Sequence, residues 1–447
     1  NYYGPVSSSV LVQIGQGTQT LQVSSNGTMA INSSLTASVV RTNINGSLLS
    51  PGRGGSLSYS ISSGGGSATV DGNGFIHAIS TGFVTLQVIA FGDTDYYGSQ
   101  TSQSIAIFYA PGGVGVGSVD LKLWLRADNG VIPDVSGNVS EWDDQSQSIT
   151  MTLNQAQPSV VSGSISVVDS GLNYNRMLSF SGGEGLSGVG DFSFGTSNTI
   201  IAVGSSAGSS GAMIFGTSNT TTGPGLTYRS SAPLGYGLNS SFGPGSAGVD
   251  LSTARILIGN YSSGTSNVGV LYNNGVLLNS SPSTGGITSS NVFTFGIGGG
   301  GYGGTISELI YLNRNLSVNE RTRAESYLAV KYGISLDPVS EPNYLASDGT
   351  VIWGGISNTS YTNTVIGIGF DTSSGLNQKQ TSSASGGDVL SLGLGTIAST
   401  NALNGSSFSV DRSFLMVGNN GISSVGSVAS GAATTSDIPI GGTPKAI

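Results

Sequence analysis

The chain has 447 residues, of which 8% are charged, 72 are glycine, one is histidine and none is cysteine. The lack of cysteine excludes disulfides and thiolate metal sites, and a single histidine excludes sites that need two imidazoles. Because the chain has only 14 basic residues against 23 acidic ones, we expect no nucleic-acid partner. No apolar run approaches the roughly 20 residues of a transmembrane helix, so we expect no membrane insertion.

Glycine and serine separate many short apolar runs, and 37% of the residues are hydrophobic. A disordered chain would have far fewer apolar residues. Short strands with frequent turns therefore predict an all-β protein, and the length predicts two to four domains of about 100–200 residues each.

The first 110 residues predict an immunoglobulin-like β-sandwich. The triplet Tyr2-Tyr-Gly4 returns as Tyr96-Tyr-Gly98, a spacing typical of such domains. We therefore expect residues 1–14 to be the terminal strand of a preceding repeat and residues 15–110 to be one complete domain. Alternating runs predict strands at Leu35–Val39, Ser56–Ile61, Phe83–Ala90 and Ser104–Phe108.

The run Ala68–Leu86, with its Asp71-Gly-Asn-Gly74 turn, is followed by Gly92-Asp-Thr-Asp-Tyr-Tyr97. This stretch resembles the bacterial Ig-like (Big) repeats of surface adhesins. The resemblance implies two strands, a tight turn and a Gly-Asp…Tyr corner.

A second domain is expected over residues 118–340, after a glycine-rich linker. Short apolar runs with Gly, Asn and Ser turns indicate a β-sandwich of jelly-roll type. One helix is predicted near its end, because Ser317-Val-Asn-Glu320 forms a capping box and Gly333 is a C-terminal stop. Ala324, Tyr327, Leu328 and the stem of Lys331 share one face of that helix.

Three passages carry a second resemblance: Leu-Trp-Leu-Arg-Ala-Asp at Leu123–Asp128, Glu-Trp-Asp-Asp-Gln-Ser at Glu141–Ser146, and Ile306–Arg321 running on to Tyr327–Gly333. They resemble the laminin-G-like, concanavalin-A-like jelly rolls of large Bacteroidota surface proteins. Residues 341–447 resemble the segment that follows this jelly roll in such proteins, and we expect a β-rich domain there that is C-terminally incomplete.

No pattern predicts catalysis, so we expect no enzyme and no catalytic residue. His77 lies in a predicted strand without a triad, and we expect it to face solvent. The Glu-x-Asp-x-Glu strand of related glucanases is missing, and Glu308 stands alone on its strand. Gly296–Gly304 contains a G-x-G-x-x-G pattern, but a strand rather than a helix is predicted after it.

Two groups are candidate binding residues. Asp128, Asp134, Asp143 and Asp144 supply oxygens of the kind calcium needs, although the Asp-x-Asp-x-Asp-Gly loop is missing and a packed Trp142 with a turn is favoured. Tyr228, Tyr236 and Tyr302 fall in or beside predicted loops, where aromatic rings serve as platforms for sugars. A basic group, Arg314, Arg321, Arg323 and Lys331, is expected to be a solvated face paired with Glu320 and Glu325.

Together these features suggest a fragment of a secreted, multidomain adhesin on the bacterial cell surface, similar to the gliding-motility adhesins of Bacteroidota. The Ig-like repeats would form a stalk in a filament with neighbouring repeats of the same longer chain. The jelly roll would bind a polysaccharide or another surface ligand non-covalently. The alternative is a purely structural spacer, or a fibre subunit that assembles by strand exchange through Val6–Ile14.

Overall fold

The structure is a computed structural model. It describes residues 15–24, 27–115, 120–146, 150–154, 164–182, 185–192, 197–206, 213–216, 225–228, 234–238, 241–246, 249–262, 268–282, 290–295, 302–340, 343–383 and 391–420. The chain divides into two compact units, an N-terminal unit (residues 1–108) and a C-terminal unit (residues 109–447). The domain boundaries proposed from the sequence stay predictions, and the strand predicted at Val6–Ile14 lies outside the described residues.

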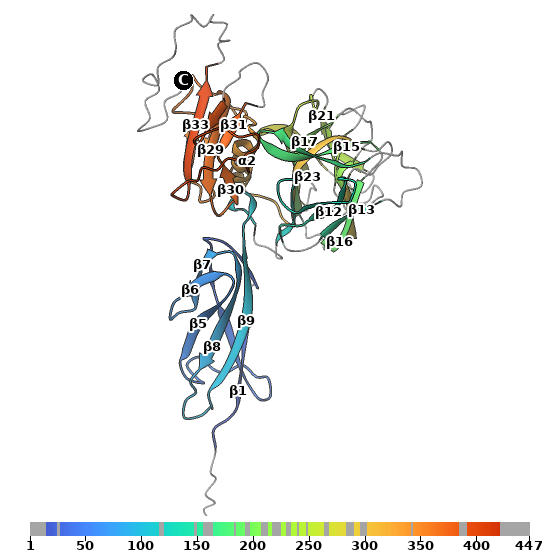
Figure 1. The fold of residues 1–447 in the computed structure, drawn as a ribbon. Coiled ribbons are helices and arrows are strands. Elements are labelled where there is room, and N and C mark those ends of the chain that lie inside the picture. Colours follow the sequence, from blue (N-terminus) through green and yellow to red (C-terminus); the bar gives the residue numbers. More distant parts are fainter. Residues whose placement is uncertain are drawn as a thin grey trace, which may run out of the picture. The chain divides into compact units, whose positions relative to one another are not determined.

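The N-terminal unit is a β-sandwich built from three small sheets (Figure 1). The largest has the order β2-β9-β8-β5, in which β2 runs parallel to β9 and the other pairs are antiparallel. The other two have the orders β3-β7-β6 and β1-β4. The strands are β1 (Gln19–Ser24), β2 (Thr28–Ala30), β3 (Ser34–Thr36), β4 (Ser38–Asn43), β5 (Leu57–Gly64), β6 (Ser67–Val70), β7 (Phe75–Ser80), β8 (Gly82–Ala90) and β9 (Ser99–Phe108).

Alternation of apolar residues builds the core of this unit. On β8, Val84, Leu86 and Val88 point inward and are fully buried, and Ile76 and Ala78 on β7 do the same. The strands predicted at Ser56–Ile61, Phe83–Ala90 and Ser104–Phe108 are confirmed as β5, β8 and the second half of β9. The strand predicted at Leu35–Val39 is wrong as a single element, because the chain breaks at Ala37 and passes from β3 in one sheet to β4 in another. His77 is exposed on β7, as expected.

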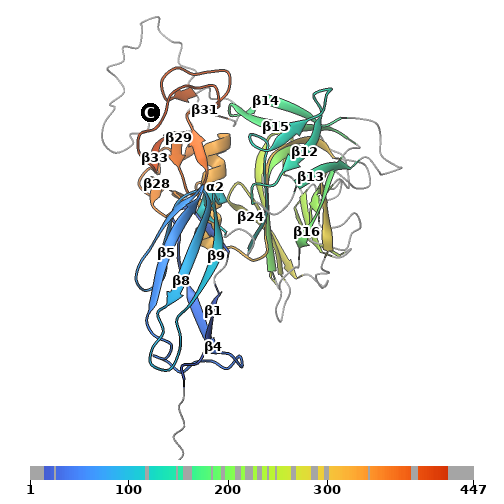
Figure 2. The ribbon, with the colours of Figure 1, turned by 60° about the horizontal axis from the view of Figure 1, so that its bottom comes forward.

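The C-terminal unit contains two larger sheets (Figures 1 and 2). The first has the order β14-β15-β26-β17-β22-β23-β24, and β10 pairs with the second half of β26. Its strands are β10 (Leu121–Arg126), β14 (Ser166–Leu172), β15 (Asn175–Ser181), β17 (Ser197–Ser206), β22 (Arg255–Ser262), β23 (Val268–Asn273), β24 (Val276–Pro282) and β26 (Gly303–Leu312).

The second sheet has the order β11-β12-β13-β16-β25-β18-β19-β20-β21. Its strands are β11 (Val131–Pro133), β12 (Val139–Asp143), β13 (Thr150–Asn154), β16 (Gly185–Phe192), β18 (Met213–Gly216), β19 (Gly225–Tyr228), β20 (Leu234–Leu238), β21 (Ser241–Ser246) and β25 (Ser290–Phe295). One core joins both sheets: Leu125, Ile200 and Tyr311 from the first pack with Trp142 and Phe215 from the second. The all-β fold with a jelly-roll-type sandwich is thereby confirmed.

The predicted helix is also confirmed as α2 (Val318–Tyr332). Ser317 caps it, since its side chain accepts a hydrogen bond from the Glu320 N–H while the Glu320 side chain accepts one from the Ser317 N–H. The helix ends at Gly333, whose φ of 63° lies in the left-handed region that glycine adopts without strain. A short 3₁₀ turn, η1 (Pro111–Gly113), contacts α2.

The segment after α2 adds three small sheets: β27-β28, β30-β29-β33 and β31-β32. Their strands are β27 (Asn343–Leu345), β28 (Val351–Gly354), β29 (Asn363–Asp371), β30 (Leu376–Gln378), β31 (Gln380–Ser382), β32 (Ser391–Gly393) and β33 (Ser413–Asn419). Strands β27, β29, β30 and β31 contact α2, so this helix is shared by the sandwich and the C-terminal strands.

Candidate functional site: a polar cleft beside the β14–β15 turn

A cleft with a volume of about 380 Å³ opens where the β14–β15 hairpin meets the C-terminal strands. A cavity of this size suits a small ligand. Its lining comes from three parts of the chain: the end of β10, the β14–β15 hairpin and the loop after β32. The lining residues are Asp128, Asp169, Tyr174, Asn175, Arg176, Thr400, Asn401, Ala402 and Leu403.

The hairpin turn carries backbone strain. Leu172 and Asn175 pair across the ladder, so Asn173 and Tyr174 form a two-residue loop. Both have positive φ, 49° and 62°. Such a loop is the type I′ turn, in which glycine or asparagine is preferred at both positions. Asn173 fits this preference, but a tyrosine in the left-handed region costs about 1–2 kcal/mol. Strain of this kind often accompanies a function.

Buried amide side chains hold the turn in place. Asn173 Nδ2 donates to the Lys331 carbonyl at 3.0 Å, and Asn173 Oδ1 accepts from the Ser382 N–H at 2.7 Å. Asn175 Nδ2 donates to the same Lys331 carbonyl at 2.8 Å and to Gln378 Oε1 at 3.0 Å. The turn is thereby tied to the end of α2 and to the C-terminal strands, beside β31 (Figure 2).

The opposite wall of the cleft is also fixed. The Asn401 N–H donates to the Tyr174 carbonyl at 2.8 Å, which ties this wall to the hairpin turn. The Asn401 side chain is engaged as well, since its Nδ2 donates to the Asn377 carbonyl and its Oδ1 accepts from the Lys379 N–H. Asn404 Nδ2 donates to Gln380 Oε1 at 3.1 Å. Both walls are therefore organised before any ligand arrives.

Hydrogen-bonding groups face the cleft with nearly balanced charge. Arg176 Nε donates to Asp169 Oδ1 at 2.7 Å, and these two side chains are 48% and 67% exposed. The Tyr174 hydroxyl has no hydrogen-bond partner within the described part of the chain. Asp128 adds a carboxylate to the lining. The cleft thus combines an aromatic side chain with donors and acceptors.

Asp128 connects the cleft to a second, buried cluster. Arg126 donates to both oxygens of Asp128, at 3.2 and 2.8 Å, and Lys331 Nζ donates to Oδ1 at 3.0 Å. Burial alone would raise the pKa of Asp128, but the charges of Arg126 and Lys331 hold it far below its usual range. Asp128 is therefore a carboxylate throughout the physiological pH range.

Glu308 on β26 is the centre of this buried cluster. Its side chain is inaccessible to solvent and accepts hydrogen bonds from four side chains. The donors are Trp124 Nε1 at 2.6 Å, Tyr327 OH at 2.9 Å, Tyr332 OH at 2.8 Å and Lys331 Nζ at 2.7 Å. Burial, and then the Glu308 charge, raise the pKa values of both tyrosines well above the usual range, so both stay hydrogen-bond donors.

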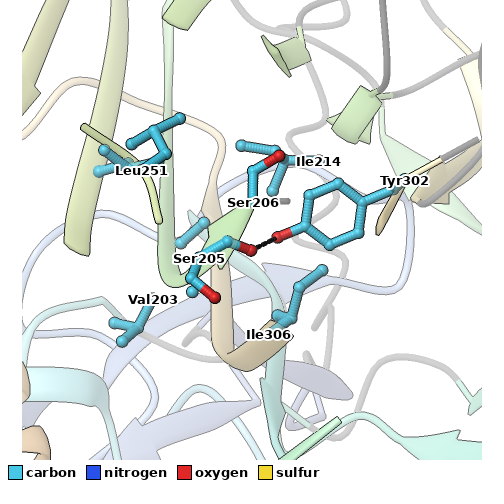
Figure 3. A pocket seen from close by; sticks show the side chains of 10 residues that line it. Val203, Ser205, Ser206, Ile214, Leu251, Tyr302 and Ile306 are labelled. Atoms are coloured by element: carbon cyan, nitrogen blue, oxygen red, sulfur yellow. Dashed lines mark hydrogen bonds between the residues drawn. The ribbon is translucent and has the colours of Figure 1, made fainter. Parts of the chain in front are cut away.

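The structure places the predicted sugar platform Tyr302 in the core rather than on the surface. Tyr302 is 1% exposed, and its ring packs edge-on against Phe180 with 5.5 Å between ring centroids. Its hydroxyl donates to the Ser205 carbonyl (Figure 3). The cavity beside it measures about 10 Å³, which is room for at most one water molecule and excludes a sugar. Burial raises the pKa of Tyr302.

The other two predicted platforms, Tyr228 and Tyr236, lie on the neighbouring strands β19 and β20. Their side chains lie outside the described part of the structure, so their role stays a prediction.

The four predicted calcium ligands have separate hydrogen-bonding roles. Asp134 Oδ1 accepts from the N–H groups of Ser136 and Asn138 and closes a turn. Asp144 is buried, and its Oδ1 accepts from the Trp124 N–H at 2.7 Å. Asp143 ends β12, where its carboxylate raises the pKa of the nearby Glu141. In the described parts of the chain, no group of three or more acidic or histidine side chains is placed to hold a metal ion.

The basic group predicted to be a solvated face is only partly so. Arg314 is one-third exposed and pairs with Glu320, and Arg321 pairs with Glu325, as expected. However, the side chains of Arg321 and Lys331 are 9% and 3% exposed. Helix α2 has little solvent-facing surface here because the C-terminal strands cover the side that the sandwich leaves free.

Sequence reasoning missed the cleft, although one signal was present. The run Gly171-Leu-Asn-Tyr-Asn175 separates two strand-like segments, and Asn at a central position indicates a type I′ hairpin. That pattern predicts a turn with Tyr174 at its tip. It does not reveal the residues near position 401 as the facing wall, because that pairing spans more than 200 positions.

Comparisons with known proteins give a family match over part of the chain. Residues 320–438 match the profile of a domain of unknown function (DUF8202). The match begins inside α2 and includes the loop after β32 that forms the far wall of the cleft. No curated protein matches this chain.

Solved structures to which part of this chain is similar include domain 4 of AbnA, an extracellular GH43 arabinanase from Geobacillus stearothermophilus, in complex with arabinotriose. It is 14% identical with a TM-score of 0.32, and the alignment covers 46% of this chain and 97% of that one. The receptor-binding domain of botulinum neurotoxin type G is 14% identical with a TM-score of 0.32, covering 46% and 51%. The binding domain of botulinum neurotoxin DC in complex with SialylT has the same identity and TM-score, covering 47% and 51%.

This chain thus spans about half the length of the two neurotoxin domains. These likenesses say nothing of what this chain binds. Separately, within the described residues no helix has both the length and the apolar character needed to span a membrane.

Proposed function

We propose that the C-terminal unit binds a glycan non-covalently in the cleft beside the β14–β15 turn, as part of an attachment protein on a bacterial cell surface. The observation that supports the proposal most is Tyr174, an aromatic residue held at φ 62° at the edge of a polar cleft of about 380 Å³. Glycine at this position would remove the strain, and the tyrosine offers a ring and a hydroxyl instead.

The chemistry of the cleft suits a neutral or weakly charged sugar. Carboxylates accept hydrogen bonds from sugar hydroxyls, while the Arg176 guanidinium and the Tyr174 hydroxyl donate to ring and hydroxyl oxygens. An aromatic ring packs against the C–H face of a sugar. Because Asp169 and Arg176 carry opposite charges and already pair, the cleft has no strong preference for an anion.

The environments of the carboxylates in the cleft fit attachment rather than catalysis. A glycosidase needs one carboxylic acid and one base or nucleophile on either side of the scissile bond. Asp169 is exposed and paired with Arg176, and Asp128 is held as an anion by Arg126 and Lys331. Neither environment creates the proton donor that glycoside cleavage requires.

The Ig-like unit would then act as a stalk within a longer, secreted, adhesin-like filament of the Bacteroidota type. This part of the proposal rests on the sequence resemblances. Weak binding at each cleft would be strengthened by many copies along a filament and over a cell.

The test is binding of the full chain to a panel of neutral and acidic glycans, with Tyr174→Ala as the first variant. We expect selective binding that falls at least tenfold in this variant, since it removes both ring and hydroxyl. Tyr97→Ala is the matched control, because Tyr97 is an exposed tyrosine of the N-terminal unit. An equal loss of glycan affinity in both variants, or an affinity that is unchanged in Tyr174→Ala, contradicts the proposed site.

A second pair of variants tests the charged side of the cleft. Arg176→Ala should weaken binding, whereas Arg412→Ala should not, although Arg412 forms a similar exposed ion pair with Asp348. If no glycan binds at all, the spacer or fibre alternative becomes the better account of this chain.

A further inference from the structure

Three side chains of the buried cluster bring one amine and two carboxylates into contact. Lys331 Nζ lies 3.0 Å from Asp128 Oδ1 and 2.7 Å from Glu308 Oε2. The Glu308 and Lys331 side chains are 0% and 3% exposed, and Asp128 is 23% exposed at the cleft. An amine thus touches one carboxylate that faces the cleft and a second one that is enclosed.

We propose that Lys331 and Asp128 condense to an intramolecular isopeptide bond, with Glu308 as the group that accepts and returns the proton. The bond would join the turn after β10 to the last turn of α2, two points 203 positions apart in the chain.

The reaction balances without any oxidant or co-reactant. Proton transfer from the Lys331 ammonium leaves a neutral amine, which attacks Asp128 Cγ and forms the new C–N bond. One former carboxylate oxygen then leaves with two protons as water, and both protons derive from the Lys331 ammonium. Glu308 is a carboxylate before and after the reaction. The products are one secondary amide and one water molecule, and no charge is created because the ion pair is consumed.

The site offers what this condensation needs. Holding two reacting groups in contact gives an effective concentration of about 10⁵–10⁸ M, which offsets the unfavourable formation of an amide in water. The Arg126 guanidinium already donates to both Asp128 oxygens, where the negative charge of the tetrahedral intermediate would develop. The released water can leave through the cleft, since Asp128 is part of its lining.

Arg126 also opposes the reaction, because it stabilises Asp128 as a carboxylate, the less electrophilic form. The contacts of the Lys331 ammonium with the rings of Tyr327 and Tyr332 oppose it as well, because a cation over an aromatic ring is stabilised in its charged form. Two features act in the other direction. The Trp124, Tyr327 and Tyr332 donors orient Glu308 toward Lys331, and consuming a buried ion pair removes its desolvation cost. We therefore expect a slow reaction.

The deciding experiment is the mass of the intact, denatured full chain after incubation at neutral pH. We expect a mass lower than that of the sequence by one water molecule. We also expect a tryptic digest with no cleavage after Lys331 and with a branched peptide that contains Asp128. A mass equal to that of the sequence, unchanged by longer incubation, overturns the proposal without any variant.

Two variants separate the bond from other losses of water. Asp128→Ala removes the carboxyl group that Lys331 would attack. Glu308→Gln removes the proton acceptor but keeps Lys331 and Asp128. Both variants should therefore have the full mass of their sequences. Asp144→Ala is the control, because Asp144 is a buried aspartate that accepts hydrogen bonds from the N–H groups of Trp124 and Ser146. Loss of water that persists in Asp128→Ala contradicts the assignment.

Discussion

The Asn401 N–H donates to the carbonyl oxygen of Tyr174 at 2.8 Å, so the strained turn of one hairpin is held by a loop more than 200 positions later in the chain. This bond joins the two walls of the cleft. It also explains how a tyrosine persists at positive φ: the surrounding contacts fix the backbone and leave the side chain at the cleft.

Tyr174→Gly should separate stability from binding. Glycine adopts φ 62° without strain, so we expect the free energy of unfolding to stay equal or to rise by up to about 1 kcal/mol. Glycan binding should be lost in the same variant, because the ring and hydroxyl are gone. Chemical unfolding and the glycan panel, applied to one preparation, measure both effects. A clear loss of stability would show that the Tyr174 side chain is a packing residue instead.

Local patterns in the sequence predicted local structure well. The capping box at Ser317 and Glu320 and the stop at Gly333 gave the helix its bounds, because capping depends on residues within one turn. Alternation predicted β5, β8 and the second half of β9 in the N-terminal unit. The buried ammonium of Lys331 could not be predicted in this way, because its carboxylate partners lie on β26 and after β10, far apart in the chain.

The same limit applies to the cleft. Asn173 and Asn175 suggest a turn, but their partners Gln378 and Ser382 come from strands 203 and 209 positions away.

Tyr302 shows the opposite case. Its glycine-rich neighbourhood suggests an exposed loop, yet the residue lies immediately before β26 and is buried in the core of the sandwich, where its hydroxyl donates to the Ser205 carbonyl.

Asn175→Asp should destabilise the C-terminal unit by about 2–4 kcal/mol. The Asn175 amide donates to three oxygens, and a carboxylate would place a buried negative charge against them. Thermal unfolding of the full chain measures the change. Asn129→Asp is the control, since Asn129 is an exposed asparagine with one side-chain partner, Gln145, and should change stability by less than about 0.5 kcal/mol. Equal effects of both variants would contradict a stabilising role for the amide cluster.

Stability should fall in acid through Glu320. Burial opposes its charge, but hydrogen bonds from Arg314 and from the Ser317 N–H lower the pKa of Glu320 from its usual 4.5 to about 2. Because the pKa is lower in the folded state, this contribution to stability is fully present above pH 4.5 and is lost as the pH falls toward 2. Unfolding measured across this range should show a weaker pH dependence in Glu320→Gln. An unchanged dependence would show that Glu320 is not protonated on unfolding in this window.

Calcium should not change the stability or the glycan binding of this chain. Three of the four candidate ligands already have a structural partner: Asp128 pairs with Arg126 and Lys331, Asp134 closes a turn, and Asp144 accepts from the Trp124 N–H. Calcium needs six to eight oxygens around one point, and these carboxylates are committed to different places. The unfolding temperature should therefore be equal in calcium and in chelator, with magnesium as the control for ionic strength. A rise in unfolding temperature with calcium alone, lost in Asp143→Asn, would instead identify a calcium site near the end of β12.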